Sequence, residues 1–148
     1  MRISVKGRYA LAAAVNIADR AERGGNISAS SIADELKISK IYLEQVFAQL
    51  KKANVLNSVK GPKGGYRLAK NPEETTAWDV LTAIELSITE TAEETVKESA
   101  VDIEMSITEN VFKPLDAAIK ASLENVTVRD LLEYARRQDE TMSYAHGI

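Results

Sequence analysis

The sequence predicts a mainly α-helical protein with one small β-hairpin. Three observations support this fold class. Apolar residues recur at helical spacing through most of the chain, serine or threonine precedes the predicted helices, and one β-branched segment runs into a glycine-rich turn. With 148 residues and no cysteine, the chain is long enough to bury a core without disulfides or a metal.

The first predicted helix covers residues 5–23, begins after Ser4 and ends at the glycine pair 24–25. Its expected apolar stripe consists of Leu11, Ala14, Val15 and Ala18. A helix of barely two turns follows over residues 29–36, with Ser28 as its cap. This second helix is too short to be stable alone, so it has to pack against its neighbours.

Ser39 is predicted to cap a third helix that extends to residue 52. Its inward face carries Leu43, Val46, Phe47 and Leu50. Its outward face carries Ile41, Glu44, Gln45, Ala48, Gln49 and Lys52. Two short helices joined by a tight turn at residues 37–38 predict a helix-turn-helix, in which the second helix reads DNA.

The outward face of the third helix has side chains that suit the major groove of DNA. Glutamine amides such as that of Gln45 match adenine, Glu44 can accept from a cytosine amino group, and Ile41 can contact a thymine methyl. Ser39 and Lys40 lie at the helix N-terminus, where backbone N–H groups favour a phosphate. The alternative is an ordinary solvated helix face with a capping serine, and these residues alone do not decide between the two.

A β-hairpin is predicted directly after this helix. Residues 55–60 alternate and are β-branched, residues 61–65 form a turn, and residues 66–69 return. In this position a hairpin is a wing, with Lys60 and Lys63 at its tip, Arg67 on the returning strand, and glycines that allow close approach to a phosphate or a minor groove. A phosphate-binding loop is excluded, because no Gly-Lys-Ser/Thr sequence opens a helix. The predicted fold is therefore a winged helix-turn-helix.

Charge divides the chain after Pro72. Residues 1–72 carry a formal charge of +8 and the remainder −11, although the whole chain has only −3. This asymmetry indicates an anion-binding surface on one module, although two solvated faces of opposite charge would give the same numbers. We expect a DNA-binding domain over residues 1–72 and a helical dimerisation and regulatory region over residues 73–148.

In the second region, Thr76 and Asp79 predict the cap of a short helix that runs through Ile84. An acidic loop is expected over residues 87–98 and a long helix over residues 101–124, interrupted at Pro114. One side of this long helix carries Ile107, Val111, Leu115, Ala118, Ile119 and Leu123. A last helix after Thr127 is expected to turn Leu131, Leu132 and Ala135 inward, before a C-terminal tail over residues 139–148. The long apolar helix predicts a homodimer, as a palindromic operator requires.

Several function classes are not expected. No apolar stretch near the start is long enough to span a bilayer, so we expect a cytoplasmic protein without membrane contact. With no cysteine, one histidine and no inferable carboxylate pair, we expect no enzyme activity, no metal and no cofactor. The main alternative to a DNA-binding regulator is an adaptor that binds an enzyme through its acidic half and its tail.

Several sequence blocks resemble the Rrf2 family of bacterial transcription regulators. They are residues 1–11, Ile32-Ala33, Ile38-Ser39, Tyr42-Leu43-Glu44-Gln45 and residues 59–66. The resemblance implies a winged-helix repressor, with Ser39, Glu44 and Gln45 on bases and the wing in a flanking minor groove. It also implies that Arg2, Lys6 and Arg8 lie near the DNA backbone. Lys60 stands where many relatives have arginine, and Ile41 where some have serine. The full predicted DNA-binding set is Arg2, Lys6, Arg8, Ser28, Ser39, Lys40, Ile41, Tyr42, Glu44, Gln45, Lys60, Lys63, Gly64 and Gly65.

One departure from the family concerns the segment before the long helix, where many members have three cysteines that hold an iron–sulfur cluster. Residues 87–106 contain none, and the single His146 cannot replace three ligands. The resemblance then implies a cluster-free branch that represses cysteine metabolism and senses through a partner enzyme, O-acetylserine thiol-lyase. The last six residues are similar to the C-terminal peptide of serine acetyltransferase, which enters that enzyme's active site. Tyr144, Gly147 and Ile148 are the predicted partner-binding residues.

Overall fold

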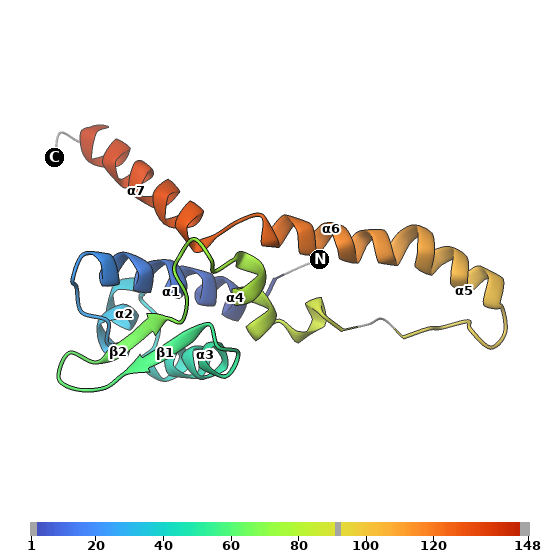
Figure 1. The fold of residues 1–148 in the computed structure, drawn as a ribbon, viewed down its shortest axis with the longest axis horizontal. Helices are drawn as coiled ribbons and strands as arrows, with labels where there is room; N and C mark the ends of the chain where they lie inside the picture. The colour runs from blue at the N-terminus through green and yellow to red at the C-terminus, as the bar shows by residue number, and fades with distance from the viewer. Residues whose placement is uncertain (1–2, 91–92, 146–148) are drawn as a thin grey trace.

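The computed structural model describes residues 3–90 and 93–145 (Figure 1). The elements run in the order α1 (Val5–Glu22), α2 (Ala29–Leu36), α3 (Lys40–Lys52), β1 (Leu56–Val59), β2 (Gly65–Leu68), α4 (Ala77–Ile84), the 3₁₀ turn η1 (Leu86–Ile88), α5 (Val101–Ile107), the π-helical turn η2 (Thr108–Phe112), α6 (Lys113–Glu124) and α7 (Val128–Ala145). The predicted fold class, mainly helical with one hairpin, is confirmed. No helix among the described residues is long and apolar enough to cross a membrane.

The predicted caps are present, and they explain where these helices begin. Ser4, Ser28 and Ser39 each accept a hydrogen bond from the backbone N–H three residues further on, which starts α1, α2 and α3. Thr76 and Asp79 exchange two such bonds at the start of α4, at 3.1 and 3.0 Å. Because each cap satisfies an N–H group that the helix itself leaves free, the helix starts are fixed locally by the sequence.

The turn between α2 and α3 gives the helix-turn-helix its geometry. Lys37 adopts a left-handed backbone conformation with φ of 57°, and the Ile38 N–H donates to the Ala33 carbonyl at 3.1 Å. Ala33 is 4% exposed, so α2 and α3 cross at a small side chain. Ile38 is 9% exposed, and its apolar side chain closes the turn.

The core lies where α1, α2, α3, β1, α4 and α7 meet, and its largest fully buried side chain is Phe47. The stripe predicted for α1 is partly wrong. Ala14 and Ala18 are buried, but Leu11 and Val15 are only half-buried, because the inward face is turned toward Ala10, Ala13 and Ile17. The longer aliphatic side chains of α1, Leu11 and Val15, therefore lie partly exposed on a second surface of the helix.

The hairpin is anchored to the body on both of its strands. Leu56 pairs with Leu68 and Val59 with Gly65, and the Tyr66 ring lies 4.5 Å from that of Phe47. The Tyr66 N–H also donates to the Ile27 carbonyl, just before α2, at 3.0 Å. The wing is therefore held in place against both helices of the helix-turn-helix.

After α4 the chain runs outward and returns as a continuous rod made of α5, η2 and α6 (Figure 1). At Pro114, where a kink or restart of the helix is expected, the rod changes to a π-helical turn just before the proline and continues as α6. Proline has no N–H, and in the turn before it the Lys113 N–H donates to Thr108, five residues back. The buried carboxylate of Glu104, in α5, accepts at 3.1 Å from the N–H of Val96 in the loop before the rod.

The last helix, α7, packs against α1 on the side away from the hairpin (Figure 1). Of the three side chains expected to face inward, only Leu132 is buried, whereas Leu131 is half-buried and Ala135 is exposed. The helix continues to Ala145, so residues 139–145, which were expected to belong to a tail, are helical.

Candidate nucleic-acid interface

The outward face of α3 is exposed along its first two turns. Ile41 is 74% exposed, and Glu44 and Gln45 lie one turn further on and are also exposed. Leu43, Val46, Phe47 and Leu50 are fully buried on the opposite face, as the helical spacing predicts. Because the core fixes the rotation of α3, an amide, a carboxylate and an aliphatic group face the solvent together.

Ser39 combines a structural bond with a free donor. Its Oγ accepts from the Tyr42 N–H at 3.1 Å, which leaves the hydroxyl hydrogen available for another acceptor. The first turn of α3 contains no acidic residue, so its positive end is not neutralised locally. Lys40 follows directly and lies 3.9 Å from the Glu44 carboxylate, a loose contact between exposed side chains. This end of the helix suits a phosphate or a base acceptor.

The wing presents two lysines at an exposed tip. Lys60 and Lys63 flank Gly61 and Pro62, and the Gly64 N–H closes the turn by donating to the Gly61 carbonyl at 2.9 Å. Figure 1 shows α2, α3 and the hairpin on the same side of α1, with α7 on the other side. α3 and the hairpin thus lie together on the side of α1 away from α7 (Figure 1).

The two glycines that end the wing turn have an internal role. A Cβ on Gly65, whose φ is 153°, would lie 1.9 Å from the Ile27 carbonyl oxygen, and one on Gly64 would lie 2.3 Å from the Val59 carbonyl oxygen. Both positions therefore need glycine for the close contacts within the wing and between the wing and the start of α2. Ser28, which caps α2, follows Ile27 directly and is half-buried beside this contact.

The predicted basic residues at the start of α1 are separated by the structure. Tyr9 packs edge-on against Tyr42, with ring centroids 5.8 Å apart, and Lys6 lies one turn earlier on the same face of α1. Lys6 is therefore placed near the first turn of α3. Arg8 is two residues further along, about 200° around the helix from Lys6, and lines a groove beside α1 that Tyr9 also borders and Lys6 does not. Arg2 lies outside the described residues.

Gln49 is not part of the exposed face of α3 on which the helical spacing places it. Its side chain is half-buried, and its Oε1 atom is buried without a hydrogen-bond partner. The helical wheel places this residue near the boundary of the face, and the wheel alone does not show which neighbours cover it. The candidate residues that the structure leaves exposed on and just before α3 are therefore Ser39, Ile41, Glu44 and Gln45.

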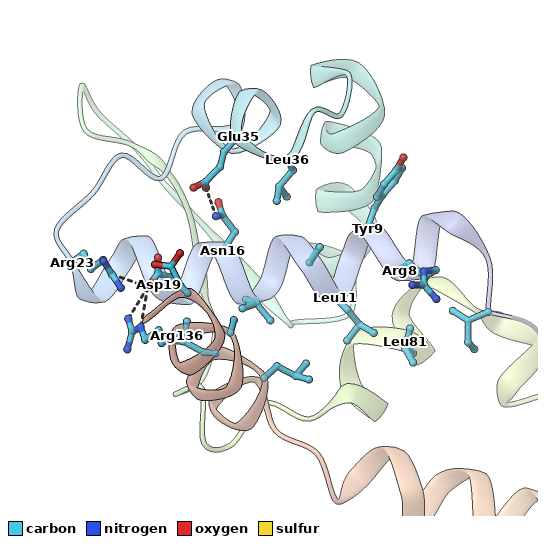
Figure 2. Close-up of a pocket in the computed structure, with 17 residues that line it drawn as sticks. Arg8, Tyr9, Leu11, Asn16, Asp19, Arg23, Glu35, Leu36, Leu81 and Arg136 are labelled. Atoms are coloured by element: carbon cyan, nitrogen blue, oxygen red, sulfur yellow. Dashed lines mark hydrogen bonds and ion pairs between the residues drawn. The ribbon is translucent and has the colours of Figure 1, made fainter. Parts of the chain in front are cut away.

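A groove that runs beside α1 is not predicted by any of the sequence patterns. The groove has a volume of about 910 Å³, and Figure 2 shows it between α1, α7 and the end of α2. Its apolar lining includes Leu11, Val15, Leu131 and Leu132. Because α1 and α7 are far apart in the sequence, no local pattern predicts that they form a common surface.

Ion pairs between α1 and α7 close one end of this groove. Asp19 binds Arg136 at 2.8 Å and Arg23 at 2.9 Å (Figure 2). Glu22 binds Arg129 and also Arg136, the latter at 3.0 Å. Hydrogen bonds from Arg129 and Arg136 lower the pKa of Glu22 to about 2. These pairs tie α7 to the C-terminal half of α1.

Comparison with known proteins identifies the family. The family model described as Rrf2, iron-dependent transcriptional regulator, matches residues 3–134. A transcriptional regulator named IscR from Yersinia enterocolitica is 33% identical over 99% of this chain and 93% of its own length. The chain belongs to the Rrf2 family.

Solved structures of Rrf2 regulators share the fold. The structure of CymR, titled the global cysteine regulator of B. subtilis, matches with a TM-score of 0.72 and 31% identity, over 90% of this chain and 98% of that one. IscR of T. potens gives a TM-score of 0.69 at 30% identity, over 91% and 88%. The oxidized form of Staphylococcus aureus CymR gives 0.66 at 35% identity, over 90% and 98%. Together with the family match, these similarities show that the protein is a DNA-binding transcription regulator.

The matched family is described as iron-dependent, and an iron–sulfur cluster would need protein ligands in this chain. It contains no cysteine, and cluster irons are bound mainly by thiolates. The buried carboxylate of Glu104, in the first helix of the rod, already accepts from the Val96 N–H. Residues 3–90 and 93–145 contain no group of three or more histidine, cysteine, aspartate or glutamate side chains arranged for a metal. The residues present do not fit such a cluster.

Proposed function

We propose that this Rrf2 regulator is a repressor that binds a palindromic operator as a homodimer, with α3 in the major groove and the wing in a flanking minor groove. The observation that carries the proposal is the joint exposure of the α3 face and the wing tip on one side of α1 (Figure 1). Ser39, Glu44 and Gln45 would contact bases, whereas Lys60 and Lys63 would contact the backbone.

Two single substitutions test this division of roles on a duplex selected by the protein from a randomised library. Gln45→Ala should reduce the preference for that duplex over random DNA by about tenfold, because a bidentate amide contact discriminates by about 1–3 kcal/mol. Lys63→Ala should weaken binding to both duplexes alike and lower the salt slope by about 1.8, because each dimer loses two phosphate contacts. Equal losses on both duplexes for both variants would reject the proposed roles.

The rod supports dimer formation. Six of its large apolar side chains are 43–60% exposed: Val101, Ile103, Met105, Val111, Phe112 and Leu115. Ile103 and Met105 point about 160° apart around α5, so the apolar band is wider than a single helix contact covers. We propose that the rod of one copy packs both against the rod of a second copy and into the second copy's groove beside α1.

This dimer can be tested by light scattering. Phe112→Glu places a charge in the proposed interface and should shift the protein to a monomer that binds the palindromic duplex weakly. Ser106→Glu adds the same charge on the polar side of α5 and should remain dimeric. Dimers of unchanged stability in the Phe112 variant would contradict the proposed interface.

The regulated genes and the partner enzyme are a further part of the proposal. We propose that the regulator controls cysteine metabolism through O-acetylserine thiol-lyase, supported by the similarity to CymR structures and by the poor fit to an iron–sulfur cluster. Gly147 and Ile148 lie outside the described residues, as does the side chain of Tyr144. Copurification with and without residues 147–148 tests the contact, because loss of the enzyme only from the shortened chain is the expected result.

A further inference from the structure

The first turn of α1 is held from outside the DNA-binding domain, by Glu85. The Glu85 carboxylate accepts the Ser4 N–H at 2.7 Å and also the Ser4 hydroxyl, across 81 residues of sequence. Ser4 is at the same time the cap of α1, since its Oγ accepts the Gly7 N–H at 3.1 Å. One oxygen of Glu85 thus holds the residue that starts the helix.

The packing around this contact leaves little freedom. A Cβ on Gly7 would lie 2.8 Å from Glu85 Oε1 and 3.3 Å from the Leu81 side chain, so α1 and α4 meet closely because Gly7 has no side chain. The first turn of α1 contains no acidic residue of its own. Glu85 therefore supplies the negative charge that stabilises the positive end of α1.

Glu85 also occupies a junction in the chain. It ends α4, its N–H donates to Leu81 at 2.7 Å, and its carbonyl accepts from Ile88 in η1 at 3.1 Å. The segment that follows leads to the tip of the rod (Figure 1). The side chain of Glu85 thus connects the start of the regulatory segment to the start of α1.

The first turn of α1 lies close to the proposed DNA surface. It contains Lys6, and one turn later Tyr9 packs against Tyr42 in the first turn of α3. Resting on the DNA-binding function proposed above, we infer that Glu85 is a positioning residue for DNA binding, which holds Lys6 beside the recognition helix through Ser4.

The sign of the effect distinguishes this role from simple electrostatics. Removing a carboxylate from a protein that binds a polyanion ordinarily strengthens binding, because one repulsive charge is lost. If Glu85 positions Lys6, removing the carboxylate weakens binding and also removes one phosphate contact from each protomer. Exposed Glu90, in the same segment, is the matched control, because it carries the same charge without a contact to Ser4.

The test measures the affinity of the full-length chain for the selected duplex at several salt concentrations. Glu85→Ala should bind about three- to tenfold more weakly, with a salt slope smaller by about 1.8 for the dimer, whereas Glu90→Ala should bind as tightly as the unchanged protein or slightly more tightly. In a Lys6→Ala background, Glu85→Ala should not lower the slope further, because the contact is already lost.

The outcomes separate the two proposals. Equal or tighter binding by Glu85→Ala, with an unchanged slope, overturns the positioning role while leaving DNA binding intact. Failure of the unchanged protein to select any duplex overturns the proposed function itself. If Glu85→Ala does not fold, Glu85→Met replaces it, since methionine keeps the length of the side chain beside Gly7 and has no carboxylate oxygen to accept from Ser4. The methionine variant should then lose affinity relative to Glu90→Met, and equal affinities of these two variants overturn the inference.

Discussion

Gly65 gives the sharpest test of how the wing is anchored. In Gly65→Ala the new Cβ would lie 1.9 Å from the Ile27 carbonyl oxygen and 2.7 Å from the Ser28 nitrogen. Both contacts are with backbone atoms, which cannot rotate away as a flexible side chain can. The strand itself therefore has to move by more than 1 Å to reach an ordinary van der Waals distance. This movement breaks the 3.0 Å hydrogen bond from the Tyr66 N–H to the Ile27 carbonyl.

The expected cost follows from these two effects. Losing the hydrogen bond costs about 1 kcal/mol, and holding alanine in a positive-φ conformation costs about 1–3 kcal/mol. We therefore expect Gly65→Ala to lower the free energy of unfolding by about 2–4 kcal/mol in urea titrations. Its DNA affinity should also show a weaker salt dependence, because a displaced wing no longer presents its lysines.

Gly61→Ala is the matched control for this experiment. Gly61 also has a positive φ, 105°, but a Cβ there meets nothing within 4 Å. Only the conformational cost of about 1–3 kcal/mol then remains, and the wing stays attached. If the two variants lose the same stability, the contact with Ile27 does not anchor the wing and the reasoning is refuted.

Three further predictions concern stability measured by urea and thermal unfolding. Lys37→Gly should stabilise the turn before α3 by about 0.5–1 kcal/mol, because glycine adopts φ of 57° without strain, whereas Lys51→Gly within α3 should destabilise the protein. Phe47→Ala should cost about 3–5 kcal/mol, since the ring is fully buried and contacts the wing, and Phe47→Leu should cost less than half of that. Glu22→Gln should cost about 1 kcal/mol at neutral pH, the pair being partly exposed and screened by solvent. Because the pKa of Glu22 is lowered from 4.5 to about 2, its contribution is complete above pH 4.5 and is lost as the pH falls through about 2. The Gln variant should therefore lose less stability than the unchanged protein over this range, and parallel acid titrations of the two would contradict the assignment.

Local features of this fold could be predicted from sequence because they depend on local chemistry. The caps at Ser28, Ser39 and Thr76 each use a side chain three residues from its partner, and the face of α3 follows from helical periodicity. The effect of Pro114 follows from its missing N–H. The exposed residues of the candidate interface belong to this local class.

Features that depend on distant segments could not be predicted. The inward rotation of α1, the groove beside it and the contact of Glu85 with Ser4 are set by α4 and α7, which begin 55 or more residues after α1 ends. The apolar residues of α1 are compatible with two rotations of the helix about its own axis. Only the packing of the α1 alanines against neighbouring elements selects one of these rotations. Likewise, helical geometry predicts that Arg8 and Lys6 point in different directions. It does not predict which residues Arg8 lies beside in the folded protein.

The spatial separation of α3 from the rod has a genetic consequence. A chain altered only in the base-reading face, for example at Gln45, would keep the apolar band with which we propose that copies associate. In a cell that makes equal amounts of altered and intact chains, random association would place at least one defective reader in about three quarters of the dimers. Such an allele should therefore be dominant over the intact one, whereas an allele that breaks the rod should be recessive.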